Sequence, residues 1–327
     1  MFTVFLSAHA GRKTTLITFG PKKWGHFTGV GVVTFSSCLC LLRRRDGFVP
    51  LISISATEPP AVISKRALAG LRDYGVVKIE SVIPPETLSD LVSDLYDSYE
   101  FVMGHVGPDS LREAGESGVV RAPLVSSENF MRLAARPDVL GIIEAVVGEA
   151  SILHLQNGFI LEPMVEQEID SRTLFQGTWH RDFPRYTGDV PLGVNAFYVL
   201  SDFTLETGAT EFVLGSHLSG SSLSSHLESL ECVVAEASPG DLVLFDSTIW
   251  HRAGTNRSRA ARLAVNHQYT FSWMKQQLDL PRLLGADRVS GLSARQQQLV
   301  GFFTRVPGAY DEFYVPQSER FYRGGQG

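Results

Sequence analysis

Two hydrophobic patterns divide the chain near Gly148. Before it, apolar residues recur at three- and four-residue spacing, which predicts amphipathic helices. After it, short apolar runs are separated by turn residues such as glycine and proline, which predicts β-strands. The strands are expected at residues 152–161, 177–183, 194–200, 210–214, 232–236, 242–245 and 263–271.

The N-terminal part of the patterned region predicts helices around one early strand. A helix is expected over Ser64–Tyr74, where Gly75 ends it, and a strand over Val76–Ile79. A second helix opens at Pro85, and a helical stretch over Glu128–Val147 is interrupted near Pro137. Helices followed by many short strands predict a mainly β fold with flanking helices, a sandwich or barrel of the jelly-roll type.

Residues 1–57 differ in charge from the rest and are interpreted as a basic N-terminal extension, poorly ordered, before a single domain at residues 58–327. The extension holds seven basic residues and one acid, whereas the whole chain carries a net charge of −6. Its apolar run Gly29–Leu42 is too short to span a bilayer, so no stable membrane insertion is expected. An organelle presequence and an unused upstream start remain alternatives, with the cytoplasm as the expected location.

Composition excludes some partners. No basic stripe interleaved with aromatic residues is present, so nucleic acid is not an expected partner. Cys38, Cys40 and Cys232 cannot form a disulfide framework and lack a second pair for a zinc set, which favours unpaired thiols in a reducing compartment. The expected partner is a small-molecule substrate, and the oligomeric state cannot be read from the sequence.

The segment around His180 and Asp182 carries the clearest chemistry. In an extended strand, residues two apart point to the same face, so these side chains would aim at one point. A neutral imidazole and a carboxylate are two of the three ligands in the facial site that holds non-haem iron(II). His251, 71 residues beyond His180, is the best candidate for the third ligand.

Arg262 follows His251 by 11 residues and opens an apolar strand. A guanidinium there is suited to bind a carboxylate through two hydrogen bonds. A dicarboxylic α-keto acid would use both features, with its keto acid end on the metal and its distal carboxylate on the arginine.

These segments together resemble the phytanoyl-CoA dioxygenase family of iron(II)/2-oxoglutarate oxygenases. The resemblance runs from about Ala69 to Tyr269. It implies a double-stranded β-helix core of the cupin-like type, with iron(II) as the metal and 2-oxoglutarate and dioxygen as cosubstrates. By the same resemblance, Gln156 faces the cosubstrate and substrate pocket and Phe197 walls the 2-oxoglutarate site. The motifs that carry it are His180-Arg181-Asp182, Gly208-Ala209-Thr210, Leu214-Gly215-Ser216-His217, Ser238 to Asp246, His251 and Asn256 to Arg262.

The resemblance implies oxidation of a small molecule, possible in specialised metabolism, with release of succinate and carbon dioxide. Related halogenases lack the carboxylate found here at Asp182, so its presence favours hydroxylation, while desaturation and ring closure stay open. Relatives often have a hydroxyl residue where this chain has Ala253, and Tyr198 or Gln156 could replace it. The alternatives are a cupin-like metal enzyme that does not use 2-oxoglutarate, which Arg262 disfavours, and a non-catalytic binding protein.

Overall fold

A computed structural model describes residues 3–4, 17–18, 51–164, 176–188 and 190–324. The chain divides into two compact units, Met1–Arg45 and Asp46–Gly327. In the first unit, the described residues form a short antiparallel pair, β1 (Thr3–Val4) with β2 (Ile17–Thr18). The expectations for Gly29–Leu42, Cys38 and Cys40 concern residues outside those described. Cys232 begins strand β9 and takes part in no disulfide with a described residue.

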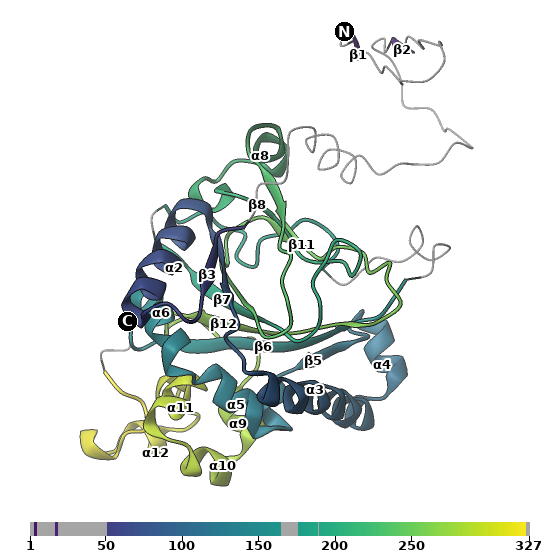
Figure 1. Cartoon of the computed structure of the whole chain (residues 1–327). Helices are drawn as coiled ribbons and strands as arrows, with labels where there is room; N and C mark the ends of the chain where they lie inside the picture. The colour runs from purple at the N-terminus through teal and green to yellow at the C-terminus, as the bar shows by residue number, and fades with distance from the viewer. Residues whose placement is uncertain (1–2, 5–16, 19–50, 165–175, 189, 325–327) are drawn as a thin grey trace. The chain divides into compact units, whose positions relative to one another are not determined.

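The second unit is built on a seven-stranded sheet, which we call the major sheet (Figure 1). Its spatial order is β3-β4-β10-β7-β12-β6-β5, and every neighbouring pair is antiparallel except β3 with β4. β3 lies in this sheet, before residue 58, where the sequence predicts that the domain begins. The strands are β3 (Ser53–Ser55), β4 (Val76–Glu80), β5 (Val119–Arg121), β6 (Ile152–Leu161), β7 (Gly193–Val199), β10 (Leu242–Asp246) and β12 (Arg262–Thr270).

A three-stranded minor sheet covers one face of the major sheet, its inner face. Its order is β11-β8-β9, from β11 (His251–Arg252), β8 (Glu211–Val213) and β9 (Cys232–Val234). A mainly aromatic and β-branched core fills the space between the sheets and includes Phe203, Phe212 and Phe245. Two facing sheets of this kind form the expected jelly-roll core, so the predicted fold class is confirmed.

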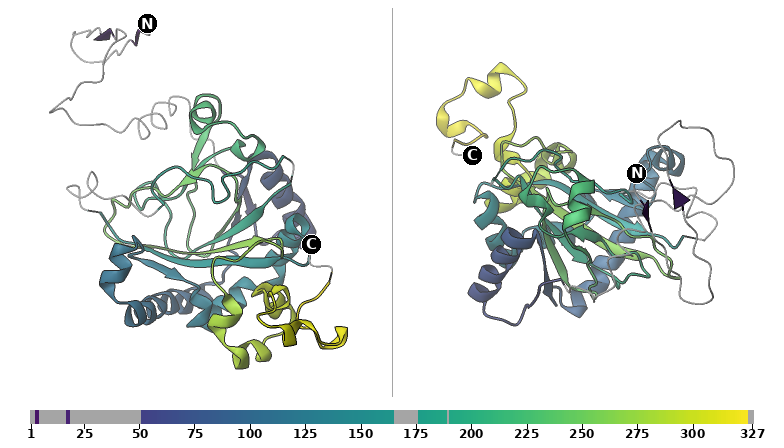
Figure 2. Two further views of the ribbon diagram at one scale, coloured as in Figure 1. Left: turned by 180° about the vertical axis from the view of Figure 1, so that it is seen from behind. Right: turned by 90° about the horizontal axis from the view of Figure 1, so that it is seen from above.

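Helices cover the opposite, outer face, as Figures 1 and 2 show. Their buried side chains and the outward residues of the major sheet form a second core, with Leu71, Leu95, Phe130, Ile143 and Tyr269 among its members. The helices before β6 are α2 (Pro60–Tyr74), α3 (Pro85–Val106), α4 (Pro108–Glu113), α5 (Glu128–Ala134) and α6 (Pro137–Val147). Later ones are α9 (Leu280–Leu284), α10 (Ala286–Gly291), α11 (Ala294–Leu299) and α12 (Tyr310–Phe313), whereas α8 (Leu223–Ser229) lies beside β8 of the minor sheet.

Helix boundaries follow the sequence signals. Gly75 ends α2 in a left-handed conformation with φ of +81°, and its amide bonds back to the carbonyl of Leu71. A Cβ atom there would lie 2.5 Å from His217 Nδ1, so the position has space only for glycine. The interruption near Pro137 is also confirmed, because α5 and α6 are separate helices.

Two parts of the fold differ from the sequence expectation. Residues 177–183 form only one isolated bridge, from His180 to His251, instead of a full strand. Helices α9 to α12, of four to six residues each, were not predicted because such short elements carry no recognisable periodicity. Among the described helices, none has both the length and the apolar character needed to cross a bilayer.

Candidate metal and cosubstrate site

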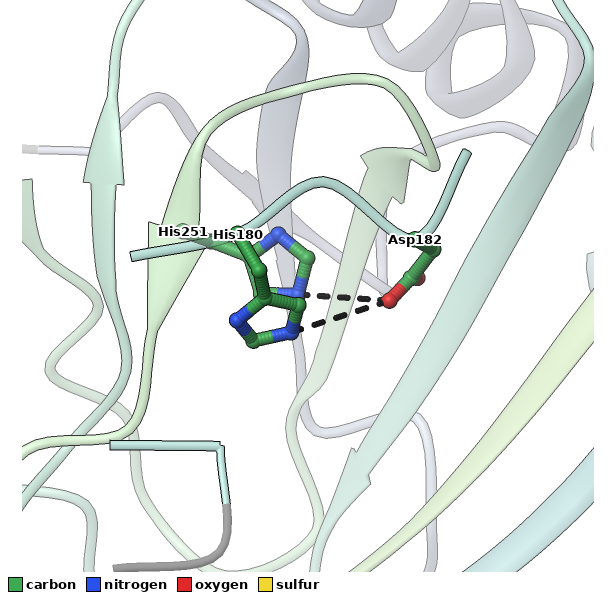
Figure 3. A group of neighbouring side chains, drawn as sticks. All are labelled: His180, Asp182 and His251. Atoms are coloured by element: carbon green, nitrogen blue, oxygen red, sulfur yellow. Dashed lines mark ion pairs between the residues drawn. The ribbon is translucent and has the colours of Figure 1, made fainter. Parts of the chain in front are cut away.

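The three predicted metal ligands converge between the two sheets. The Nε2 atoms of His180 and His251 lie 3.8 and 3.7 Å from the same oxygen of Asp182, Oδ1 (Figure 3). One ligand atom from each of the three residues lies within 4.8 Å of the others. Two imidazole nitrogens and one carboxylate oxygen at this spacing can hold a single metal ion from one side.

Hydrogen bonds fix which nitrogen each histidine presents. Nδ1 of His180 lies 2.8 Å from the carbonyl of Thr178, and Nδ1 of His251 lies 3.0 Å from the carbonyl of Ile249. Because a carbonyl only accepts, each Nδ1 carries the proton and each Nε2 presents a lone pair. The Nε2 atom of His180 is buried without a protein partner. Burial is the main cause that lowers the pKa of His251, which favours the neutral, ligating form.

Backbone pairing brings the ligand segments together. His180 and His251 exchange two backbone hydrogen bonds of 3.0 Å, which places their rings 4.3 Å apart. Arg181 lies between His180 and Asp182 in the chain, but its side chain points away from theirs. It donates to the carbonyls of Ser216 and Ser219. The side chains of this segment therefore alternate in direction as they do in extended backbone, although only His180 is paired as in a strand.

The turn after β10 delivers His251. The Oδ1 atom of Asp246 accepts from both the amide and the hydroxyl of Thr248, at 2.7 and 2.6 Å. This side-chain bond mimics a backbone turn and reverses the chain. The amide of Trp250 then donates to the hydroxyl of Ser216, which sets the start of β11. The turn from Asp246 to Trp250 therefore orients His251.

Asp182 is held by residues that the sequence reasoning missed. Asn195 on β7 and Gln268 on β12 each donate to its Oδ2 atom at 2.9 Å. Ser247 accepts from both amides, at 2.9 and 3.2 Å. The available signal was one amide residue in the otherwise apolar strand β7 and two amide residues, Asn266 and Gln268, in β12.

Arg262 is a buried cation in the same pocket. It is 4% exposed, donates to the carbonyl of Gly208 and lies over the ring of Phe203 at 4.7 Å. Its Nε atom has no partner, and no described acid acts on its charge. Burial alone lowers the pKa of Arg262 to about 10, so it remains charged at neutral pH. A buried guanidinium without a counterion is a site for an anion.

The loop before β12 sets the position of this arginine. Asn256 is fully buried and donates to the carbonyls of Leu161 and Ala260, both at 2.8 Å. Gly208 lies against this loop, where a Cβ atom would stand 2.6 Å from the carbonyl oxygen of Gly254. The close approach of these two segments allows Gly208 to accept from the guanidinium.

One pocket contains most of the predicted site. Asp182, His251, Phe197 and Arg262 all line it, and His180 adjoins it through its contact with His251. Thr210 and Ala253 also line the pocket. His251 pairs with Phe212, and Arg252 pairs with Glu211. The next position in this antiparallel register makes Thr210 and Ala253 neighbours. Thr210 thus offers a hydroxyl beside the position where Ala253 has none.

The structure does not bring Gln156 or Tyr198 to this pocket. The amide of Gln156 accepts from Leu124 N at 2.7 Å and donates to the carbonyl of Phe130 at 3.1 Å, both under the helices. The hydroxyl of Tyr198 donates to the carbonyl of Leu133 on the same outer face. The prediction that Gln156 faces the pocket is therefore wrong. The prediction that Tyr198 or Gln156 replaces a hydroxyl at position 253 is wrong for the same reason. On β6 and β7 the inward positions are occupied by alternating neighbours such as Phe159 and Phe197.

Comparisons with known proteins show the family of this chain. The model of the family described as phytanoyl-CoA dioxygenase matches residues 71–264, which is more than half of the chain. An uncharacterized protein of Mycobacterium tuberculosis, Rv1501, is 38% identical and aligns over 79% of this chain and 93% of its own length. The dioxygenase olcK of Penicillium canescens is 33% identical over 72% of this chain and 79% of its own. The crystal structure of the epimerase SnoN, at 18% identity, has a TM-score of 0.49 and covers 64% of this chain and 84% of that one.

Proposed function

The chain belongs to the phytanoyl-CoA dioxygenase family, and from that premise we propose that it is an iron(II)/2-oxoglutarate-dependent dioxygenase that hydroxylates a small molecule. One observation carries the proposal. The triad of His180, Asp182 and His251 shares a pocket with the buried, uncompensated cation of Arg262. A metal ion alone would not require the arginine, whereas a chelating keto acid with a second carboxylate engages both.

The donor set fits iron(II). Imidazole suits iron among other transition metals, and two imidazoles with one carboxylate on one side leave positions open for other ligands. The buried Nε2 atom of His180, without a protein partner, is the orphaned group that such an ion would satisfy. When bound, iron would supply the redox chemistry that couples decarboxylation of 2-oxoglutarate to activation of dioxygen and oxidation of the substrate.

The protein side chains would bind and orient the cosubstrate. Arg262 would bind its distal carboxylate by charge-assisted hydrogen bonds in a setting with little competing water. Phe197, 7% exposed and edge-on to Phe159 at 5.9 Å, would form an apolar wall beside its methylene groups. The Thr210 hydroxyl would donate a further hydrogen bond to the same carboxylate. These contacts would fix the orientation of 2-oxoglutarate in the pocket.

The carboxylate of Asp182 supports hydroxylation as the outcome. It would serve as the third protein ligand of the metal, so a halide would have no vacated protein position to fill. A small organic substrate in specialised metabolism remains part of the proposal, and its identity is left to experiment.

Anaerobic absorption spectroscopy tests this function. Iron(II) and 2-oxoglutarate are added to the metal-free full-length protein, and the weak visible charge-transfer band of the chelate is recorded. We expect the band in the wild type and its loss in His180→Ala. A matched control is His105→Ala, because His105 lies on the exposed surface of α3 and should leave the band unchanged. A wild-type protein that binds iron(II) but forms no band with 2-oxoglutarate would instead favour a metal enzyme of another type.

A further inference from the structure

Four polar side chains on the inner face of the major sheet form a hydrogen-bonded cluster, and two of them bond to the Oδ2 atom of Asp182. Asn195 and Gln268 donate to Oδ2, and both also donate to the hydroxyl of Ser247. Asn266 donates to Oδ1 of Asn195 at 2.8 Å. We call Asn195, Ser247 and Gln268 the amide clamp.

The clamp is rigid because its members come from buried, paired backbone. Asn195, Ser247 and Gln268 are each at most 1% exposed. Asn195 and Gln268 are direct neighbours in the register between β7 and β12, near the centre of the major sheet. The amide of Ser247 donates to the carbonyl of Gly193, which ties the turn after β10 to the same strand. The clamp therefore holds its position independently of what occupies the pocket.

The carboxylate sets the direction of every hydrogen bond in the cluster. An ionised carboxylate only accepts, so Asn195 and Gln268 must both direct their amide hydrogens toward Asp182. The oxygen of Asn195 then faces the amide hydrogens of Asn266. The Oδ1 atom of Asn266 is left buried and without a partner in the pocket. Each orientation follows from the one before it, so the cluster has one consistent arrangement.

Both clamp bonds reach the same oxygen, and the other oxygen faces the histidines. Oδ2 accepts from Asn195 and Gln268, while Oδ1 lies 3.7 and 3.8 Å from the two Nε2 atoms. Without those bonds, rotation of the carboxylate could bring its second oxygen toward the metal and fill a position that the cosubstrates need.

We propose that Asn195 and Gln268, braced by Ser247, are positioning residues that hold Asp182 as a one-oxygen metal ligand. This inference rests on the proposed function, because it assumes that the triad binds a metal. It assigns a role to three residues that carry neither the metal nor the cosubstrate.

Metal affinity tests the clamp without turnover. Metal-free full-length protein is titrated with Mn²⁺, and free Mn²⁺ is followed by electron paramagnetic resonance. Gln268→Met keeps the side-chain length but removes both donors, and we expect Mn²⁺ to bind roughly 10- to 100-fold more weakly. Gln156→Met makes the same change one strand away on the outer face. That control should lower the thermal midpoint and leave Mn²⁺ affinity unchanged.

The absorption spectrum of the Co²⁺-loaded protein provides a second readout, because it reports ligand number and geometry. We expect Gln268→Met to change the visible bands and Gln156→Met to keep them. If Gln268→Met does not fold, Ser247→Ala serves instead, with a smaller loss of Mn²⁺ affinity and the same spectral change expected.

Each result is decisive. Wild-type Mn²⁺ affinity and an unchanged Co²⁺ spectrum in a folded clamp variant would overturn the clamp and leave the proposed function standing. Failure of the wild type itself to bind Mn²⁺ or Co²⁺ would overturn the proposed function and the clamp with it.

Discussion

The two faces of the major sheet differ in how completely protein partners satisfy their buried polar groups. On the outer face, Gln156 bonds to Leu124 and Phe130, and the hydroxyl of Tyr269 donates to the carbonyl of Ala134 at 2.8 Å. On the inner face, buried atoms of His180, Arg262, Asn157 and Asn266 have no protein partner. Buried polar groups are normally satisfied, so the groups that are not mark where a ligand belongs.

This difference separates residues that stabilise the fold from residues that would bind a ligand. A polar side chain on the outer face completes a network under the helices, and its loss should weaken folding. On the inner face the amide clamp is likewise satisfied, whereas Arg262 keeps an unpartnered Nε atom, and loss of a group of this second kind should weaken binding. Variants on the two faces test whether folding and binding depend on different residues.

The largest expected effect on binding is that of Arg262→Ala. Loss of a charge-assisted interaction with the distal carboxylate should raise the Kd for 2-oxoglutarate roughly 10- to 100-fold. Isothermal titration of the Mn²⁺-loaded protein measures it. Arg259→Ala, a matched change at an exposed position in the same loop, should leave the Kd as it is. An equal Kd in the two variants would remove Arg262 from the cosubstrate site.

His267 supplies the corresponding test on the outer face. Its Nε2 lies 2.8 Å from the amide nitrogen of Gln156, which donates to it, so protonation would set two donors against each other. Burial lowers the pKa of His267 from 6.5 to about 3. The unfolded chain therefore binds more protons between these values, and stability is present above about pH 6.5 and lost as pH falls toward 3.

This group alone should lower the free energy of unfolding by about 1.4 kcal/mol for each pH unit in that range. Urea unfolding at a series of pH values measures the slope. His267→Leu should be less stable near neutral pH but show a flatter dependence on pH, with unchanged Kd for 2-oxoglutarate. A slope identical to that of the wild type would show that His267 does not titrate in this way.

The smallest expected effect is that of Thr210→Val. Removal of one neutral hydrogen bond should raise the Kd for 2-oxoglutarate about fivefold. Ala253→Ser in the Thr210→Val background should recover part of the loss, because residue 253 is the neighbour of Thr210 across the strand pair. A Kd that does not respond to Thr210→Val would exclude this hydroxyl from the site.

The sequence predicted the candidate triad of His180, Asp182 and His251, which the structure brings together, because its information is local. His180 and Asp182 need only extended backbone between them, and His251 follows a turn whose Asp246–Thr248 bonds are encoded within three residues. β6 was also predicted with its correct ends, because its apolar run is bounded by turn residues. Features of this kind can be predicted without knowing which strands pair.

The face of each strand residue needed long-range information. Gln156 and Asn157 are adjacent, and a shift of one residue exchanges the inner and outer faces. The register that decides between them pairs Arg262 with Leu161 and His267 with Gln156, across about a hundred residues of chain. Tyr198 could have been assigned from alternation alone, because its neighbour Phe197 was already expected to face the pocket. The clamp on Asp182 depends on the same register and was missed for the same reason.

A crystal structure of the full-length protein with Mn²⁺ and 2-oxoglutarate, soaked without dioxygen, tests the central claim most directly. We expect anomalous density for one Mn²⁺ ion bound by His180, Asp182 and His251, with Asp182 contributing one oxygen. We also expect the distal carboxylate of 2-oxoglutarate on Arg262 between the two sheets. Mn²⁺ at any other site, or 2-oxoglutarate bound away from Arg262, would contradict this claim.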